Sequence, residues 1–184
     1  MLEKLLENIA KALDAYRIQY MIIGGQAVLL YGEPRLTKDI DITLGVGPDL
    51  LETLKLIIKD LGLKILVRDT EDFVRRTLVL PTLDEESGFR VDFIFSFSPY
   101  ERQAMQRVKT VEMGGAKVRF ASVEDLIIHK VIAGRPRDIE DAKNVLLKNP
   151  NIDKEYILKW LKEFDRSLNE NFIERFEKIL EQIS

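Results

Sequence analysis

The 184-residue sequence predicts an α+β fold, a mixed α/β architecture in which helices flank a mixed β-sheet and a helical extension follows. Three observations support this class. Apolar residues recur at three- and four-residue steps near the N-terminus, polar and apolar residues alternate in several segments before residue 120, and the helical period returns after it. We therefore expect an α/β core over residues 1–120 and, packed on it, a helical extension over residues 121–184.

Glycine and proline residues divide the first half of the core into short elements. Gly24-Gly25 follows an apolar run, Gly32 and Pro34 close the next segment, and Pro48 suits the first turn of a helix. The predicted elements are helices near residues 2–16, 26–31 and 48–61 and strands at residues 20–23 and 39–44.

Strand patterns dominate the second half of the core. A turn at residues 84–88 separates two strands, and Gly114-Gly115 joins the last two into a hairpin. Because Pro81 cannot donate a ladder hydrogen bond, its strand is predicted to lie at a sheet edge. The predicted elements are strands at residues 64–67, 77–83, 89–95, 108–113 and 116–120 and a short helix at residues 99–105.

The C-terminal extension is predicted to be helical throughout. Ser122, followed three residues later by Asp125, predicts the N-cap of its first helix. The predicted helices span residues 123–133, 137–148, 153–164 and 169–183. Apolar side chains at helical spacing in the last two helices are expected to form the core of a helical cap or a dimer surface.

The composition excludes several kinds of chemistry. The chain has no cysteine and one histidine, His129, which rules out disulfides, thiolate metal sites, cysteine nucleophiles and multi-histidine metal sites. We expect His129 to be structural. The formal net charge of −3 argues against a general basic nucleic-acid-binding protein. Because no segment resembles a targeting or membrane-spanning sequence, we expect a cytoplasmic protein without membrane contact.

Two glycines and three aspartates form the candidate site. Asp39 and Asp41 lie two residues apart on a predicted strand, so their carboxylates leave the same face with Cα atoms about 6.6 Å apart. Asp92 lies on another alternating strand. Carboxylates gathered on one sheet face repel each other without a counter-cation, and Mg²⁺ is bound by such oxygens together with substrate phosphates. Gly24-Gly25 precedes a helix whose first turn can approach a phosphate closely, although a tight turn alone would also explain the two glycines.

These residues carry a resemblance to a known superfamily. Ile23-Gly24-Gly25 and Asp39-Ile40-Asp41, with thirteen residues between them, are similar to the signature of the DNA polymerase β-like nucleotidyltransferases. Asp92 matches the third carboxylate of that superfamily. The closest similarity is to the minimal bacterial and archaeal group that includes the AbiEii-like nucleotidyltransferases. The resemblance covers residues 20–147 and implies a nucleotidyltransferase-like fold.

The resemblance implies transfer of NMP from an NTP to an acceptor by a two-metal mechanism. Asp39 and Asp41 would hold both Mg²⁺ (or Mn²⁺) ions, and Asp92 would hold the catalytic ion and help to deprotonate the attacking hydroxyl. The acceptor would be a small molecule, a protein or a tRNA. The residues assigned to nucleotide binding are Gly24, Gly25, Gln26, Arg35, Lys38 and Lys130. Those assigned to acceptor or phosphate contacts are Arg135, Arg137, Asp138 and Asp141.

Simpler explanations exist for some of these residues. A solvated loop would account for Arg35 and Lys38, and a surface ion pair at i and i+4 would account for Arg137 and Asp141. One position departs from the superfamily, because Gly25 stands where many members have a serine that contacts a phosphate. Gln26 is a candidate substitute donor.

This departure motivates an alternative function. The chain would then be a non-catalytic nucleotide- or partner-binding regulator, or a toxin–antitoxin component, with an antitoxin or a second copy of itself as partner. The presence of all three acids argues against it. A metal-dependent phosphohydrolase ranks lowest, since such a site would normally use more ligands, including histidines.

Overall fold

The computed structural model describes all residues from 1 to 184 and contains one seven-stranded sheet. Its strands are β1 (Tyr20–Ile23), β2 (Asp39–Leu44), β3 (Lys64–Ile65), β4 (Val79–Asp84), β5 (Phe89–Phe95), β6 (Lys109–Met113) and β7 (Ala116–Phe120). They are arranged in the order β3-β4-β5-β2-β1-β7-β6. The pairs β2–β5 and β1–β7 are parallel and the others are antiparallel, so the sheet is mixed, as predicted.

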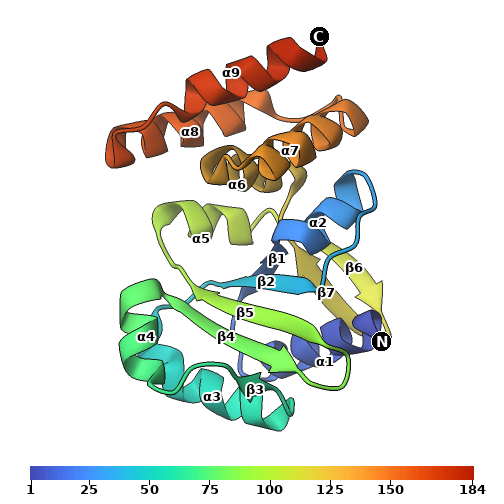
Figure 1. Ribbon diagram of the computed structural model, residues 1–184, viewed down its shortest axis with the longest axis vertical. Coiled ribbons are helices and arrows are strands. Elements are labelled where there is room, and N and C mark those ends of the chain that lie inside the picture. Colours follow the sequence, from blue (N-terminus) through green and yellow to red (C-terminus); the bar gives the residue numbers. More distant parts are fainter.

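Nine α-helices surround the sheet. They are α1 (Leu2–Ala15), α2 (Gly24–Tyr31), α3 (Leu51–Asp60), α4 (Thr70–Thr77), α5 (Pro99–Met105), α6 (Val123–Ala133), α7 (Pro136–Lys148), α8 (Lys154–Leu168) and α9 (Phe172–Ile183), with a 3-10 turn, η1 (Pro48–Leu50), before α3. Figure 1 shows α6–α9 as a layer at one end of the molecule, with α3 and α4 at the other end. No helix is both long enough and apolar enough to span a membrane.

Two expectations for residues 64–84 were wrong. Strand β4 lies between β3 and β5 rather than at an edge. The carbonyl of Pro81 points toward β3, where it accepts from the Leu66 backbone N–H, and an N–H of the same residue would point to the same side. Because the pairing of β3 ends at Ile65, the missing N–H falls where the ladder stops and is tolerated. Helix α4 was not predicted, and Thr77 ends it instead of starting a strand. Helix α4 is only eight residues long and only Val74 of it is buried, so few apolar residues mark it in the sequence.

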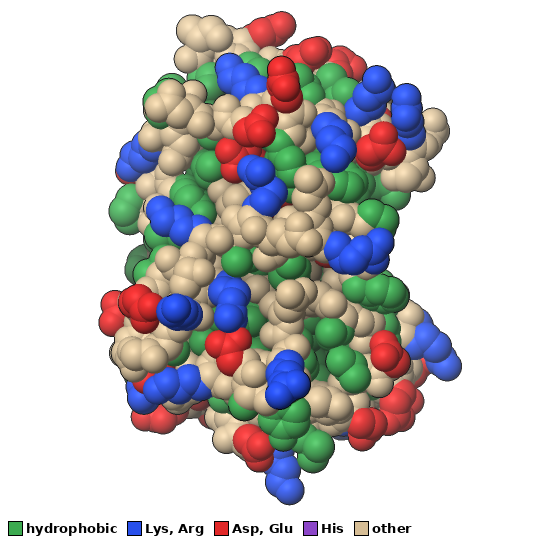
Figure 2. Space-filling model, turned by 180° about the vertical axis from the view of Figure 1, so that it is seen from behind, with side chains coloured by type: hydrophobic (Ala, Val, Ile, Leu, Met, Phe, Trp, Pro, Cys, Tyr) green, Lys and Arg blue, Asp and Glu red, His purple; other side chains and the backbone are tan.

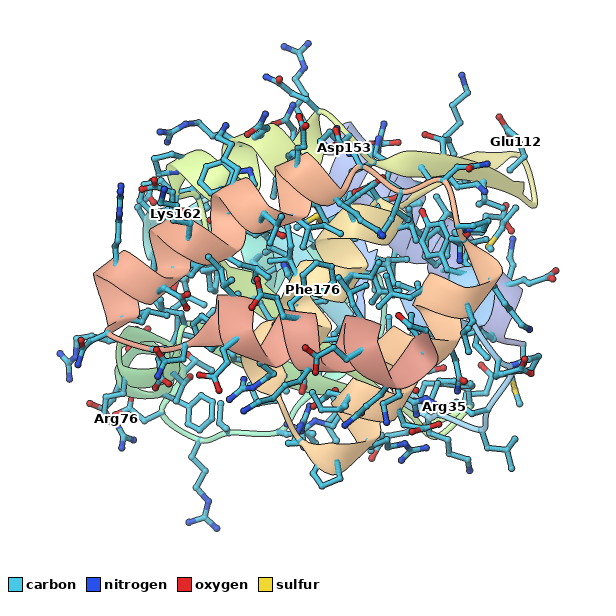
Figure 3. The ribbon with its side chains drawn as sticks, turned by 90° about the horizontal axis from the view of Figure 1, so that it is seen from above. Arg35, Arg76, Glu112, Asp153, Lys162 and Phe176 are labelled. Carbon is cyan, nitrogen blue, oxygen red and sulfur yellow. The ribbon has the colours of Figure 1, made fainter.

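The C-terminal helices share one continuous hydrophobic core with the sheet. Figure 3 looks onto α8 and α9, which lie side by side with the fully buried Phe176 between them. Helix α5 joins this layer to the sheet, because the indole N–H of Trp160 donates to Gln103 Oε1 at 3.0 Å. The Tyr100 ring also packs edge-on against Trp160 at 5.2 Å between ring centroids. On the face seen in Figure 2, basic and acidic side chains are interspersed over the surface.

A buried polar cluster ties α8 to the start of α6. The Asp125 carboxylate is fully buried and accepts from the hydroxyls of Ser122 (2.6 Å) and Tyr156 (2.7 Å). Ser122 Oγ in turn accepts from the Asp125 backbone N–H, which is the predicted N-cap. The Arg107 guanidinium lies over the Tyr156 ring, 3.9 Å from its centroid. Each buried group in the cluster therefore depends on its partners.

Removing one hydroxyl from this cluster should destabilise the protein. We expect Tyr156→Phe to lower the free energy of unfolding by about 1–3 kcal/mol, because Asp125 would lose a donor while remaining buried. Urea unfolding followed by circular dichroism measures this. Tyr16→Phe is the matched control, since Tyr16 is exposed and makes no side-chain hydrogen bond. Equal stabilities of the two variants would contradict the role assigned to the Asp125 cluster.

Candidate active site

Strand register brings the two glycines and the acids together. Strand β1 runs antiparallel to β2 and its last residue, Ile23, pairs with Asp41. On the other side of β2, the parallel strand β5 pairs Asp41 with Asp92. The end of β1, where α2 begins at Gly24, therefore lies beside the same row of the sheet as both aspartates.

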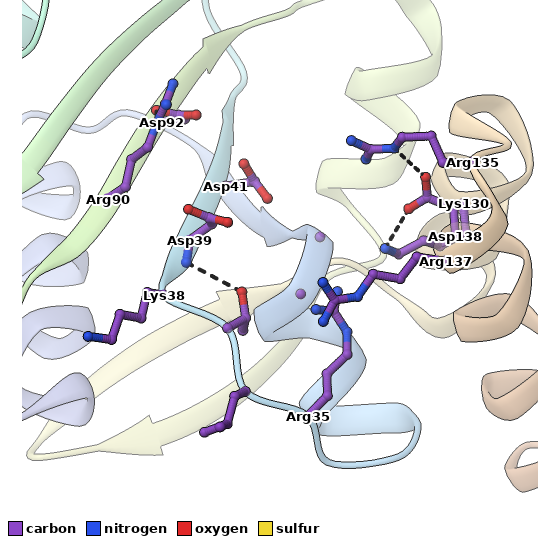
Figure 4. A pocket seen from close by; sticks show the side chains of 14 residues that line it. Arg35, Lys38, Asp39, Asp41, Arg90, Asp92, Lys130, Arg135, Arg137 and Asp138 are labelled. Carbon is purple, nitrogen blue, oxygen red and sulfur yellow. Dashed lines mark hydrogen bonds and ion pairs between the residues drawn. The ribbon is translucent and has the colours of Figure 1, made fainter.

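The three carboxylates occupy one face of the sheet (Figure 4). Asp39 and Asp41 alternate with the fully buried Ile40 on β2. On β5, Val91 and Phe93 are buried against the opposite face, which directs Asp92 to the side of the β2 acids. The apolar face of these two strands thus anchors the acids on the polar face.

Gly24 is required by both its conformation and its surroundings. Its φ of +65° lies in the left-handed region that favours glycine. A Cβ atom at this position would also collide with the Asp41 carboxylate. The turn from β1 into α2 therefore allows the backbone to lie directly against the acid.

Burial and like charge act together on Asp41. Desolvation first, and then the charges of Asp92 and Asp39, raise the pKa of Asp41 to about 6, against the opposing charges of Lys130 and Arg135. A nearby cation would therefore stabilise the charged form of this carboxylate.

A cation already present beside the acids is Arg90. Its Nε lies 2.8 Å from Asp92 Oδ1, and Arg90 pairs in the sheet register with Asp39. In this arrangement no group of three acidic or histidine side chains converges closely enough to hold a metal ion. The donor set nevertheless suits a hard cation, since all three acids offer carboxylate oxygens on one face.

A buried ion-pair network forms the opposite wall of the site. Lys130 of α6 lies 2.9 Å from Asp138 and 2.8 Å from Asp141, and all three side chains are buried. Arg135 pairs with Asp138 at 2.7 Å, and Arg35 pairs with Asp141 at 3.2 Å. Desolvation is the largest single effect on Asp138 and would raise its pKa, but the hydrogen bonds and charges of Arg135 and Lys130 together outweigh it and hold the pKa below its usual value.

The surface ion pair between Arg137 and Asp141, the simpler explanation that their spacing allowed, does not form. Asp141 faces Lys130 and Arg35 instead, because the helix turns it inward. Arg137 is exposed, lines the cleft and makes no ion pair. Lys38 is likewise exposed without an acidic partner. Gln26 is buried outside the cleft, where its side-chain amide donates to the Asp39 carbonyl at 3.3 Å.

These elements enclose a cleft of about 570 Å³. Six cationic side chains line it against four acids, so the cleft is locally positive although the whole chain is acidic. The lining residues are Gly24, Gly25, Arg35, Leu36, Thr37, Lys38, Asp39, Asp41, Arg90, Asp92, Lys130, Arg135, Arg137 and Asp138. Such a surface suits a polyanionic ligand held next to the acids.

A second, more apolar cavity of about 420 Å³ adjoins the cleft. It shares Gly24, Asp41 and the α6–α7 turn with the cleft, and it extends between β5, α5, α6 and α8. Ile94 and Phe164 are among its apolar lining residues. His129 also lines this cavity, with a pKa that is lowered chiefly by burial. Asp41 therefore lies at the boundary between a polar and an apolar space.

Three residues that line the cleft were not assigned from the sequence: the apolar Leu36 and the polar Thr37 and Arg90. Both polar residues had a local signal. Thr37 lies two residues before Asp39 in the loop that enters β2, and Arg90 lies two residues before Asp92 on the same face of β5. Counting back two residues from Asp39 and from Asp92, to the neighbour on the same side of the chain, would have identified Thr37 and Arg90.

Neutralising Asp41 should stabilise the metal-free protein in a pH-dependent way. The unfolded carboxyl titrates near pH 3.9 and the folded one at about 6. The charged form thus opposes folding, with a penalty that grows between these values and is complete above pH 6. We expect Asp41→Asn to raise the free energy of unfolding by about 1–3 kcal/mol at pH 7.5. The gain should vanish by pH 4.

Chemical unfolding in EDTA at both pH values measures this difference. Glu86→Gln, in the exposed turn before β5, is the control that removes a carboxylate outside the cleft. A gain from Asp41→Asn that is equal at pH 4 and pH 7.5, or no gain at all, would contradict the prediction.

Several solved structures share this fold. The antibiotic-resistance factor ANT(2'')-Ia has a TM-score of 0.59 at 19% identity, with 91% of this chain and 92% of that chain covered. The lincomycin-bound lincosamide antibiotic adenylyltransferase LnuA has a TM-score of 0.54 at 20% identity, with 77% and 94% covered. An antigenic nucleotidyltransferase-like protein from Paracoccidioides brasiliensis has a TM-score of 0.55 at 18% identity, with 91% and 90% covered.

The sequence comparisons address the family directly. No curated protein matches the sequence. A family model described as "Nucleotidyltransferase of unknown function (DUF6036)" matches residues 1–183. Because this match spans nearly the whole chain, the protein belongs to that nucleotidyltransferase family, which confirms the class predicted from the glycine and aspartate motifs.

Proposed function

We propose that the protein transfers a nucleoside monophosphate from an NTP to an acceptor hydroxyl or phosphate, with Asp39, Asp41 and Asp92 as the catalytic carboxylates. One observation carries this proposal. The three acids share a sheet face beside the first turn of α2, and they open into a cleft with more cationic than acidic side chains. Such a cleft can take a triphosphate while the acids take its metal ions.

The proposed cofactor is Mg²⁺ or Mn²⁺. Its support is the donor chemistry of three carboxylates and the raised pKa of Asp41, which a divalent cation would relieve. Asp39 and Asp41 would hold two such ions and Asp92 would hold one of them; bound there, they would supply positive charge to offset the charge that develops on the phosphates during transfer. Arg90 pairs with one carboxylate oxygen of Asp92 only, so we assign to Arg90 the role of holding Asp92 in place on the face that it shares with the β2 acids.

We propose the triphosphate contacts from the cationic side chains of the cleft that are not paired with an acid. Lys38 and Arg137 line the cleft without acidic partners and can each pair with a phosphate. Lys130 and Arg135 are already paired with Asp138 or Asp141, so they contribute to phosphate binding chiefly by shaping the wall. Arg35 pairs with Asp141 through one terminal nitrogen only, so part of its guanidinium stays available to a phosphate. The first turn of α2 has no side-chain cap, which leaves its N–H groups available to an anion.

The adjoining apolar cavity supports an organic ring as part of the substrate set. Its volume of about 420 Å³ falls in the range of small-molecule sites. The ring belongs either to the base of the NTP or to the acceptor. Among the similar structures, ANT(2'')-Ia was solved in complex with adenylyl-2''-tobramycin, which makes small hydroxylated molecules the first acceptors to test.

Removing either acid of β2 should abolish transfer. The assay incubates the protein with α-labelled NTPs, Mg²⁺ or Mn²⁺, and separate small-molecule, protein and tRNA fractions. We expect the wild type to label one fraction, and Asp39→Asn or Asp41→Asn to reduce the rate at least about 100-fold, because each loses a ligand of the charge-neutralising ions. Glu86→Gln should keep the wild-type rate.

Two outcomes would contradict the proposal. One is transfer that is unchanged in both aspartate variants. The other is no transfer to any fraction, combined with NTP binding that calorimetry finds to be independent of metal. The second result would favour the non-catalytic nucleotide-binding regulator.

A further inference from the structure

A hydroxyl group lies over the start of α2, whose first two residues, Gly24 and Gly25, have no side chain. A Cβ atom on Gly25 would lie 2.9 Å from Thr37 Oγ1 and 3.2 Å from a terminal nitrogen of Arg35. The φ angle of Gly25 is not positive, so its conformation does not demand glycine. Glycine is needed at this position because the loop before β2 fills the space above it.

The Thr37 hydroxyl has a free proton. Its oxygen accepts from the Asp39 backbone N–H at 3.3 Å (Figure 4), and the hydroxyl donates no hydrogen bond within the protein. Thr37 is half-buried and lines the cleft. The accepted bond orients the oxygen while the O–H remains available to a ligand in the cleft.

Arg35, on the same loop, has a second hydrogen-bond donor without a partner. One terminal nitrogen contacts Asp141, whereas the Nε atom is buried without a hydrogen-bond partner. A buried unpaired donor is costly unless a ligand or water satisfies it. The tether to Asp141 holds the loop over α2, so the hydroxyl and the guanidinium face the uncapped helix turn together.

We propose that Thr37 binds the triphosphate of the NTP, donating its hydroxyl proton to a phosphate oxygen above Gly25. Arg35 positions the loop and adds charge. This inference rests on the proposed nucleotidyl transfer and extends it. It assigns the phosphate-binding side chain to Thr37 in place of Gln26. The side-chain amide of Gln26 already donates to the Asp39 carbonyl outside the cleft.

A hydroxyl at position 25 and Thr37 cannot occupy the same space. A serine at position 25 would need Thr37 shortened to alanine, since both the Oγ1 and the Cγ2 atoms of Thr37 crowd the Cβ position. The two positions should therefore exchange roles, with either one supplying the hydroxyl but not both.

The first test removes the hydroxyl while preserving shape. Calorimetry with Mg²⁺-tripolyphosphate, a probe without a base, should show about 10- to 100-fold weaker binding for Thr37→Val. Thr37→Ser should stay within about threefold of the wild type, since it keeps the charge-assisted hydrogen bond. Thr110→Val, on the exposed edge strand β6, is the matched control and should bind as the wild type.

A Mn²⁺ titration followed by electron paramagnetic resonance separates phosphate binding from a structural effect on Asp39. All three variants should keep the wild-type Mn²⁺ affinity within about twofold. Thr37→Val that binds tripolyphosphate normally, or that weakens Mn²⁺ and tripolyphosphate equally, would overturn the inference. If the wild type also transfers NMP normally, the proposed function survives that result.

The second test is the exchange. Gly25→Ser and Thr37→Ala should each weaken tripolyphosphate binding, and the double variant should bind more tightly than either single variant. A double variant at least as weak as the weaker single variant would show that the hydroxyl above α2 does not bind phosphate. A wild-type protein that neither binds tripolyphosphate with Mg²⁺ nor transfers NMP would instead refute the proposed function itself.

Discussion

The buried ammonium of Lys130 organises one whole wall of the candidate site. It comes from α6 and lies between Asp138 and Asp141, which are three residues apart on α7. A buried pair of this kind adds little net stability, but losing one partner is severe, so the charges fix the relative placement of α6 and α7. Through Asp141 the same network holds Arg35, and with it the loop that leads into β2. The cleft depends on this one lysine being fully paired.

The sheet supplies the other wall by a different principle. There the register of three neighbouring strands, and no ion pair, sets the positions of Gly24, Asp41 and Asp92. The apolar side chains behind them are fully buried, so a shift by one residue would turn the acids into the core. One wall is thus fixed by hydrophobic packing and the other by charge, and the ligand space lies between them (Figure 4).

Local patterns were sufficient for much of this architecture. The hairpin across Gly114-Gly115 and the helix capped by Ser122 carry their own turn and cap signals, and both formed as predicted. The alternation around Asp39 and Asp41 likewise placed both acids on one polar face. Helix α4 also has a cap signal, because the Asp69 side chain accepts from the Asp72 backbone N–H, but the helix is only eight residues long with one buried side chain, and it was not predicted.

Non-local contacts were beyond the reach of spacing rules. The separation of Arg137 and Asp141 allowed a surface pair as one explanation, whereas Asp141 pairs with Lys130 of α6 and with Arg35 of a distant loop. The edge position predicted from Pro81 failed for the same reason, since two residues of β3 cover that strand. The contact between Thr37 and the space above Gly25 joins two loops that only the folded sheet brings together. Predicting these contacts requires the tertiary arrangement itself.

The joint between α5 and α8 gives the molecule a built-in optical probe. Trp160 is the single tryptophan of the chain, and its indole is held by Gln103 and by the Tyr100 ring. All tryptophan emission therefore originates where the sheet meets the helical layer. Tyr100 and Phe164, which contact each other there, also border the apolar cavity beside Asp41. Intrinsic fluorescence thus monitors, without labelling, the region where a ring-bearing substrate would enter.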